Sequence, residues 1–375
     1  MQLKPLFLER MQKLLPDKKD FQDYLDILKI PPVRSIRCNV LKISPFELKK
    51  KLEEKDWKIK QPWENYPEIM IVKGKISAYP SSQIDNKINN KNQLSSIPAH
   101  INLLKQTSDF SLTTSDKSAS VSEPTSRVGG KDIDLEPGEL GRALEHLLGY
   151  YYMQELASML PVIALKPERN ETILDLCAAP GSKTTQLSSE LQGTGTIIAN
   201  EVSMGRLKIL ASNLEKCGAS NTIITRKEGF AFCNRMKKNN FQFDRILVDA
   251  PCSGEGTLRS SPKTYLMWNI KTIKNLPKIQ KSLIASALEI LEPKGILVYS
   301  TCTHAPEENE GVVDKILKEF PNIKLEKINL PIKYREGITN WEDKQFSNEV
   351  KKCARVYPHD NNTEGFFIAK IRKID

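Results

Sequence analysis

Several features typical of membrane, metal-binding or secreted proteins are missing from this sequence of 375 residues. No stretch approaches the roughly 20 consecutive apolar residues that span a bilayer. The seven cysteines are scattered and odd in number, with no CxxC pair and no Cys/His group at metal-ligand spacing. We therefore expect a soluble, cytoplasmic protein with reduced thiols, and neither a metal site, a disulfide framework nor a membrane segment.

Positive charge, by contrast, is in excess. Lys and Arg total 56 against 46 Asp and Glu, so the formal net charge is +10 and the sequence pI is about 9.1. Such a balance suits a polyanionic partner, although the same lysines also suit a solvated surface. The length and the hydrophobic content of 39% are enough for one large and one smaller folded unit.

Composition divides the chain into three parts. Residues 1–77 indicate a small mixed region, with an amphipathic opening helix, a strand in SIRCNVLKI and a charged helix for which Ser44 is the N-cap and Pro45 the first residue. Residues 78–133 are rich in Ser, Asn, Thr, Lys and Gln, which predicts a flexible insertion that cannot bury enough apolar surface to order itself. Apolar residues at helical spacing over 139–165 then lead into a larger unit, 134–375.

The larger unit alternates between branched apolar strands and amphipathic helices. The expected strands are TILDL, TIIANE, NTIIT, FDRILVDA and GILVYST, and the later segments IKLEKI and GFFIAKI complete a seven-stranded sheet. We expect the last strand to be antiparallel and to lie at an edge. This pattern predicts an α/β, Rossmann-like fold, in which helices cover both faces of a mostly parallel sheet.

A tight turn follows the first of these strands, in LDLCAAPGSKTTQL at residues 174–187. The strand ends at Asp175, small residues make the turn, and a helix is expected from Thr184. Ligands of such sheets bind at the carboxyl ends of the strands, where helix N-termini offer free N–H groups. The segment matches neither G-x-x-x-x-G-K-[ST] nor G-x-G-x-x-G, so it predicts a nucleotide-sized ligand but disfavours a phosphate-binding P-loop.

Acidic residues follow the next two strands. Glu201 comes after TIIAN, where a carboxylate can accept hydrogen bonds from both hydroxyls of a ribose. Taken alone, Glu201 would be an ordinary surface acid, and its place in the sheet favours the ribose role. Glu228, after the third strand, is similarly placed to face an adenine or ribose edge.

Two cysteines lie just beyond hydrophobic strands. Cys252 follows Asp249 in DRILVDAPCSGEGTLRSSP, and Cys302 follows Ser300 and Thr301 in LVYSTCTHAPEENE. If these strands are neighbours, both thiols reach the cleft that holds the glycine turn. Free cysteines are usually buried packing residues. That interpretation fits the other five better than these two, which lie in polar turns: Cys38, Cys177, Cys217, Cys233 and Cys353.

In their order and intervals, CAAPGSKT, DAPCSGEGT and YSTC resemble the Sun (Fmu) family of RNA cytosine-5 methyltransferases. The resemblance covers about residue 135 to the end. RCNVLK at 37–42 is similar to the family's small RNA-binding element, YMQELAS at 152–158 to its lead-in helix, and ARVYPHDNNTEGFFIAKIRK to its closing hairpin. The resemblance implies an S-adenosylmethionine-dependent enzyme, expected as a monomer, that acts on RNA. Transfer RNA is favoured over ribosomal RNA, and both stay open.

The resemblance also implies roles for individual residues. The turn would line the S-adenosylmethionine pocket with Cys177, Ala178, Ala179, Pro180, Gly181, Ser182 and Lys183. Glu201 and Arg206 would serve the ribose, and Glu228 and Asp249 would complete the pocket. Cys302 would be the nucleophile, and Cys252 would assist product release. Ser182 stands where a second glycine is frequent and Glu228 where aspartate is usual, which puts details of cofactor affinity in doubt.

Cytosine-5 methylation explains why these residue types are needed. Carbon 5 is a poor nucleophile until a thiolate adds at carbon 6. Because a free thiol has a pKa near ~8.5, Cys302 should lie in an electropositive pocket, with Lys183 as the candidate cation. Asp249 is the candidate for neutralising charge at ring nitrogen 3. Attack by Cys252 is the alternative, as in DNA cytosine-5 enzymes with a Pro-Cys nucleophile, but the Thr-Cys motif favours Cys302.

The target base must be unpaired or flipped out of its stack. Candidates for holding the strand by charge and stacking follow the Pro-Cys turn, namely Arg259, Lys263, Tyr265 and Trp268. For Trp268, packing in the core is an equal alternative. We assign no role to His304 or His359. Two rivals stay open: an RNA-binding or assembly factor that keeps the fold without the chemistry, and a DNA cytosine-5 methyltransferase.

Overall fold

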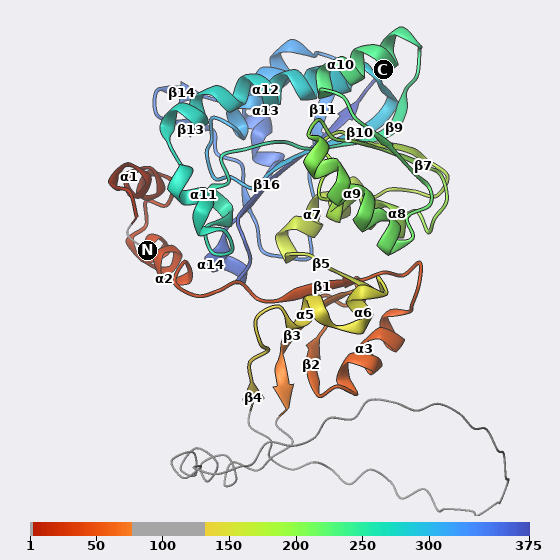
Figure 1. The fold of residues 1–375 in the computed structure, drawn as a ribbon. Coiled ribbons are helices and arrows are strands. Elements are labelled where there is room, and N and C mark those ends of the chain that lie inside the picture. Colours follow the sequence, from red (N-terminus) through yellow and green to blue (C-terminus); the bar gives the residue numbers. More distant parts are fainter. Residues whose placement is uncertain (1–2, 77–131) are drawn as a thin grey trace, which may run out of the picture.

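The computed structural model describes residues 3–76 and 132–375, which form a small sheet and a large sheet one above the other (Figure 1). Nearly all of the insertion predicted at 78–133 lies outside the described residues. Its last two residues form strand β4 (Asp132–Ile133), which pairs with β3 (Ile69–Ile76). The last two positions that the composition assigned to the insertion therefore belong to the small sheet.

The N-terminal region contains the helices and strands that the sequence predicted. Helices α1 (Pro5–Leu14) and α2 (Lys18–Ile27) come first, and α3 (Pro45–Glu53) lies between β1 (Ser35–Cys38) and β2 (Trp57–Lys60). Ser44 begins α3 with a complete capping box, which it shares with Glu47, so the predicted N-cap is confirmed. The small sheet has the antiparallel order β2-β3-β1-β5.

The fourth strand of that path, β5 (Tyr151–Met153), interrupts the stretch predicted to be helical. Residues 139–165 form α5 (Glu139–Arg142), α6 (Leu144–Leu147), β5 and α7 (Leu156–Leu165). Gly149 turns the chain at φ +71, and a Cβ there would lie 2.0 Å from the Lys216 carbonyl oxygen. The aromatic residues that follow favour a strand. The small sheet thus takes strands from both sides of the predicted insertion.

The large sheet contains all seven predicted strands. They are β6 (Thr172–Asp175), β7 (Thr196–Asn200), β8 (Thr222–Thr225), β9 (Phe243–Asp249), β10 (Leu291–Thr301), β11 (Ile323–Glu326) and β16 (Phe366–Lys373). Two short strands, β12 (Arg335–Glu336) and β15 (Ala354–Val356), extend the sheet. Its order is β12-β15-β16-β10-β9-β6-β7-β8, with β11 on β16. The α/β fold class is confirmed.

Strand β16 is antiparallel, as predicted, but it is not an edge strand. It pairs with β10 on one side, and with β15 and β11 on the other. Its first residues, Phe366 to Ala369, are all buried, which suits an internal strand covered on both faces. The strands from β8 to β10 are mutually parallel, so their carboxyl ends meet at one edge of the sheet.

Helices cover both faces of the large sheet (Figure 1). One face carries α7, α8 (Ser182–Glu190) and α9 (Met204–Cys217), and the other carries α10 (Gly229–Lys238), α12 (Ile270–Glu289) and α13 (Glu310–Glu319). Helix α8 begins at Ser182 rather than at Thr184, and α12 extends well before its predicted segment LIASALEIL. Shorter elements complete the chain: η3 (Glu255–Thr257), α11 (Pro262–Met267), β13 (Asn340–Trp341), β14 (Lys344–Gln345), η4 (Asn348–Lys352) and α14 (Pro358–Asn361).

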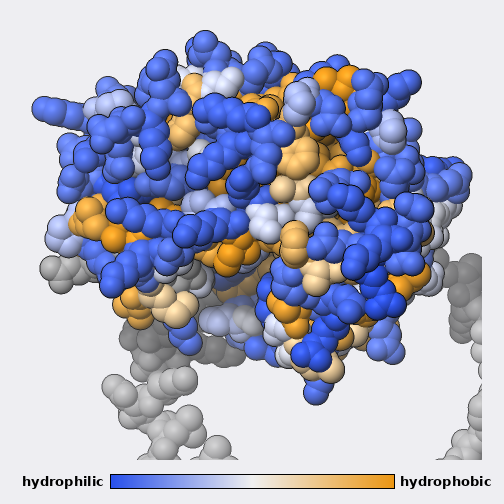
Figure 2. Space-filling model, turned by 90° about the horizontal axis from the view of Figure 1, so that it is seen from above, coloured by the Kyte–Doolittle hydropathy of each residue, from blue (hydrophilic) through white to orange (hydrophobic). Residues whose placement is uncertain are grey.

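The outer surface over α10 and α12 is largely hydrophilic, with apolar residues in small separate groups (Figure 2). Exposed lysines recur at helical spacing along α12, at Lys271, Lys274 and Lys278. Across residues 3–76 and 132–375, none of the helices combines the length and the apolar character needed to span a bilayer.

Candidate active site

A cavity of about 290 Å³ lies where the carboxyl ends of β6, β9 and β10 meet. Its lining comes from the turn after β6, from the ends of β9 and β10, from the start of α7 and from the segment around Glu364. The lining residues are Glu155, Ser158, Asp175, Cys177, Ala178, Ala179, Pro180, Ser182, Lys183, Asp249, Thr257, Ser260, Cys302, Glu364 and Phe366. The predicted turn, Asp249 and Cys302 are therefore brought together in one place.

The turn after β6 is built around a glycine and a buried acid. Gly181 has φ +104, a conformation that side chains rarely adopt, and it is the N-cap of α8. Asp175 accepts a hydrogen bond from Thr184 Oγ1 at 2.7 Å, while its Oδ1 is buried without a partner among the described residues. Burial raises the pKa of Asp175 to about 7. Asp175 thus places a buried carboxyl group in the lining of the cavity.

Arg37, which the sequence placed in an RNA-binding element, is buried against this turn. Its guanidinium donates to the Ser182 carbonyl oxygen at 2.9 Å and to Thr185 Oγ1 at 2.8 Å, and it also bonds Gln154. Arg37 therefore ties the small sheet to the start of α8, and it does not present its charge to solvent.

Lys183 and Asp249 form an ion pair on the cavity wall. Lys183 Nζ lies 2.8 Å from Asp249 Oδ2 and 3.0 Å from Ser158 Oγ. Asp249 Oδ1 accepts from Ser300 Oγ at 2.7 Å, because Asp249 and Ser300 are register partners in the parallel pair β9 and β10. Both carboxylate oxygens are thus fixed, and a single ammonium group faces the cavity.

The two cysteines predicted to share a cleft are in contact. Cys302 Sγ lies 3.2 Å from Cys252 Sγ, and the Cys302 N–H donates to the Cys252 sulfur at 3.3 Å. Cys302 lines the cavity, whereas Cys252 lies beside it and outside the lining. The neighbouring Cys302 thiol, together with burial, raises the pKa of Cys252. Cys177 also lines the cavity, but burial raises its pKa as well, as expected for a packing thiol.

Three predicted cofactor residues lie outside the cavity lining. Arg206 connects buried Glu201, at 3.2 Å, to the carbonyl oxygen of Ala179, so this pair lies at the edge of the cavity. Glu228 is exposed and caps α10 by accepting from the N–H groups of Phe230 and Ala231. A helix cap accounts for Glu228, and its contact with a cofactor stays a prediction.

Two residues predicted to hold RNA are instead part of the core. Arg259 is buried and donates to the backbone oxygens of Ile30, Pro31 and Thr363. Trp268 is also buried, and its indole N–H donates to Glu255 Oε1 at 2.8 Å, which decides for the packing alternative. Both side chains join the opening helices and the closing segment to the loop after Cys252.

The other two residues predicted to hold RNA, and the two histidines without an assigned role, have different surroundings. Lys263 is exposed and free to meet a polyanion, and the side chain of Tyr265 lies outside the described residues. His304 stacks on Tyr357, and burial lowers its pKa to about 3, in keeping with the absence of an assigned role. His359 lies 2.8 Å from Asp20.

Several lining residues were missed by sequence reasoning. Glu155 caps α7 through the N–H groups of Ala157 and Ser158, and it also accepts from the N–H of Glu364. Burial raises the pKa of Glu155 to about 7. Glu364 is buried as well, with Oε2 lacking a partner among the described residues. These residues are far apart in the sequence, and the only available signal was the position of Glu155 directly before a strongly apolar helix.

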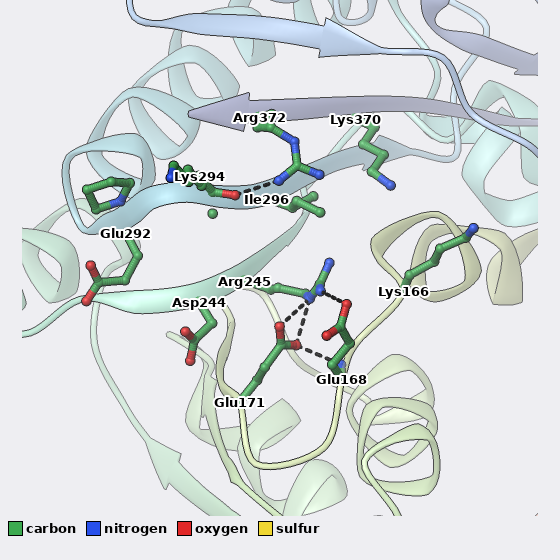
Figure 3. A pocket seen from close by; sticks show the side chains of 12 residues that line it. Lys166, Glu168, Glu171, Asp244, Arg245, Glu292, Lys294, Ile296, Lys370 and Arg372 are labelled. Carbon is green, nitrogen blue, oxygen red and sulfur yellow. Dashed lines mark hydrogen bonds and ion pairs between the residues drawn. The ribbon is translucent and has the colours of Figure 1, made fainter. Parts of the chain in front are cut away.

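A second cavity, of about 310 Å³, lies at the opposite edge of the sheet, near the amino ends of β6 and β9 (Figure 3). Arg245 dominates it, with its guanidinium 2.6 Å from Glu171 and 2.9 Å from Glu168. The guanidinium also donates to the Leu165 carbonyl oxygen. The lining contains neither a cysteine nor the glycine turn, and we assign the chemistry to the first cavity.

Comparison with known proteins identifies the family. The model of the family described as 16S rRNA methyltransferase RsmB/F matches residues 162–372. The chain belongs to the RsmB/F methyltransferase family. The resemblance noted in the sequence is thereby confirmed.

Individual RsmB/F relatives are named for different RNA substrates. The chain is 44% identical over 243 residues to a tRNA (cytosine(49)-C(5))-methyltransferase of Pyrococcus abyssi, which covers 65% of this chain and 76% of that protein. It is 33% identical over 377 residues to a ribosomal RNA small subunit methyltransferase F of Erwinia tasmaniensis, with 99% of this chain covered. The chain spans only 63% of the length of that relative.

Solved structures resemble the RsmB/F chain over nearly its whole length. A methyltransferase homolog protein from Pyrococcus horikoshii has a TM-score of 0.69 at 28% identity, and the match covers 99% of this chain and 100% of that one. NSun6 from the same organism, solved with SFG, has a TM-score of 0.72 at 24% identity and covers 100% and 99%. These similarities confirm an S-adenosylmethionine-dependent methyltransferase fold.

Proposed function

We propose that this chain methylates carbon 5 of cytosine in RNA, with Cys302 as the nucleophile that adds to carbon 6. The observation that carries the proposal is the contact of 3.2 Å between the sulfurs of Cys252 and Cys302, at a cavity lined by Cys302, Lys183 and Asp249. Family membership supports the same class of reaction. Two thiols side by side suit a reaction in which a covalent bond to the base is first made and then broken.

The cavity fits S-adenosylmethionine. Its lining has four carboxyl side chains against one lysine, which suits a ligand with a sulfonium and an ammonium group. Residues 177–183 would hold the cofactor, with Glu201 and Arg206 at the ribose and Glu228 near the adenine. When bound, S-adenosylmethionine supplies an electrophilic methyl group.

In the first half of the reaction, side chains at the cavity form the covalent intermediate. The Cys302 thiolate adds to carbon 6, at a cavity that Lys183 and Asp249 also line. We assign to a protonated Asp249, held in place by Lys183 and Ser300, the hydrogen bond that neutralises the charge developing at ring nitrogen 3. Addition converts carbon 5 into an enamine-type nucleophile that can accept the methyl group.

The second half of the reaction releases the product. Cys252, acting as a thiolate, takes the proton from carbon 5 and becomes a thiol, and the electrons of that carbon–hydrogen bond form the double bond between carbons 5 and 6. The bond between carbon 6 and sulfur breaks, and its electron pair leaves on Cys302. The contact between the two sulfurs supports this role, because the proton acceptor must lie beside the leaving thiolate.

Transfer RNA is the favoured substrate. The relative named for a tRNA cytosine shares 44% identity, and this chain spans 76% of it, against 33% and 63% for the relative named for ribosomal RNA. The net charge of +10 and the exposed lysines of α12 support a polyanionic partner. Lys263, exposed just beyond the Cys252 loop, is one candidate for a phosphate contact.

Methylation assays with labelled cofactor on tRNA, ribosomal RNA and DNA test the proposal, followed by bisulfite sequencing of the labelled RNA. We expect Cys302→Ala to abolish methylation while it keeps cofactor binding, and Cys252→Ala to trap RNA in a covalent complex that survives denaturing electrophoresis. Turnover by the Cys302 variant would overturn the assigned nucleophile. Label in DNA alone, or no label with any substrate, would favour one of the two rival functions.

A further inference from the structure

Two buried side chains hold the peptide segment that carries Cys252 from both sides. Gln280 on α12 donates from Nε2 to the Pro251 carbonyl oxygen at 2.9 Å. Glu308, in the loop after β10, accepts the N–H of Ser253 at 3.0 Å. The same Gln280 nitrogen donates to Glu308 Oε2 at 2.8 Å, which links the two halves. The residues before and after Cys252 are thus fixed by one connected set of hydrogen bonds, here named the Gln280–Glu308 clamp.

The clamp places two polar side chains at buried positions, where apolar side chains are more common. Gln280 and Glu308 are each 0% exposed, and each keeps one oxygen without a partner among the described residues. Unpaired buried oxygens of this kind lower stability, so stability alone does not explain the pair. Burial raises the pKa of Glu308 to about 7, and the charge of Glu308 in turn raises the pKa of Cys252. The pair therefore acts on both the position and the ionisation of this thiol.

Cys302 is held by different contacts. Cys302 follows β10, whose residue Ser300 is the register partner of Asp249 on β9. The carbonyl oxygen of Cys302 accepts the N–H of Gly256 at 2.9 Å. Among the described residues, neither Gln280 nor Glu308 forms a hydrogen bond with Cys302. Loosening the clamp should therefore displace Cys252 more than Cys302, which separates the two halves of the reaction.

We propose that the Gln280–Glu308 clamp positions Cys252 for resolving the covalent RNA intermediate and contributes little to forming it. This inference rests on the proposed function. Neither residue touches the base: both act through the backbone on either side of Cys252, and they keep its sulfur where it can take the proton from carbon 5. When the clamp fails, that proton stays, the bond between carbon 6 and the Cys302 sulfur persists, and RNA remains attached.

Gln280→Met tests the clamp, because methionine is similar in size but cannot donate the hydrogen bonds to Pro251 and Glu308. Gln186→Met is the matched control: Gln186 is 1% exposed on α8, donates to the Met159 carbonyl oxygen and accepts from Gln154. Among the described residues it hydrogen-bonds neither Cys252 nor Cys302. We expect Gln280→Met to lower turnover by up to about 100-fold, since small displacements of a reacting group cost that much. Covalent RNA should accumulate at steady state in Gln280→Met and not in Gln186→Met.

Cys252→Ala provides the reference that separates this inference from the proposed function. If Cys252→Ala itself traps no RNA, the proposed mechanism fails. If it traps RNA but Gln280→Met loses adduct and turnover in parallel, the clamp is only structural and the inference is overturned. Should thermal unfolding show that Gln280→Met does not fold, Glu308→Met repeats the test, because it removes the oxygen that accepts from Ser253 and Gln280 and keeps a similar side-chain size.

Discussion

The two cavities lie at opposite edges of one sheet and have similar volumes, about 290 and 310 Å³. At the amino edge, the guanidinium of Arg245 is matched to two carboxylates and a backbone oxygen (Figure 3). At the carboxyl edge, oxygens of Asp175 and Glu364 stay unpaired, and two thiols lie in contact. Volume does not distinguish these cavities, whereas unsatisfied hydrogen-bonding and reactive groups do.

The same contrast appears in the electrostatics. Burial raises the pKa of Asp175 and of Glu155 at the carboxyl edge to about 7, so ionising either group there opposes folding. At the amino edge, the guanidinium of Arg245 is paired with both Glu171 and Glu168, at 2.6 and 2.9 Å. One edge is thus arranged to bind and react, and the other to hold strands together.

The largest expected effect is that of Lys183→Met at the carboxyl edge. The variant removes the single ammonium of the cavity lining and leaves Asp249 with only Ser300 as a partner. We expect the single-turnover rate of methylation to fall by roughly 10²- to 10⁴-fold, the usual range for a group that acts on proton and charge movement in the reaction. A rate close to that of the unmodified protein would show that the reaction does not depend on this cation.

Arg245→Met at the amino edge should have the opposite profile. The Glu171 side chain is 17% exposed and would be left without its cation, whereas Glu168 is 76% exposed and contributes little. We expect the free energy of unfolding in urea to fall by about 3 kcal/mol, as for other broken buried pairs. The methylation rate per folded molecule should not change, and a lower rate would mean that the two cavities are coupled.

Local patterns in the sequence were enough to predict the strands and the reactive cysteines. Cys252 and Cys302 each follow a strand, and strand alternation implies that such residues gather at one edge. Their contact required β9 and β10 to be neighbours, which the sequence left conditional and the register confirms. The N-cap at Ser44 was also predicted correctly, because a helix cap depends only on residues within one turn.

What the sequence missed depends on contacts between distant segments. Arg259 and Trp268 were assigned to RNA because they follow the Pro-Cys turn, but the opening helices and the closing segment bury them. Strand β5 lies within a stretch of helical spacing and is fixed by pairing with β1, more than 100 residues earlier. Glu155 and Glu364 meet at the cavity only after folding. Spacing along the chain carries no information about such pairs.

The smallest expected effect concerns pH and tests whether Asp175 differs from the paired acids of the amino edge. An aspartate in the unfolded chain releases its proton near pH ~4, whereas burial keeps the proton on folded Asp175 up to about pH 7. Over that interval the folded state binds more protons than the unfolded state, so Asp175 makes stability fall as pH rises, and its effect levels off above about pH 7. Asp175→Asn should make this decline shallower, measured as the free energy of urea unfolding against pH, while Arg245→Met should leave the contribution of Asp175 in place. An unchanged or steeper decline in Asp175→Asn would mean that Asp175 ionises normally, and its unpaired oxygen would then be no sign of a ligand site.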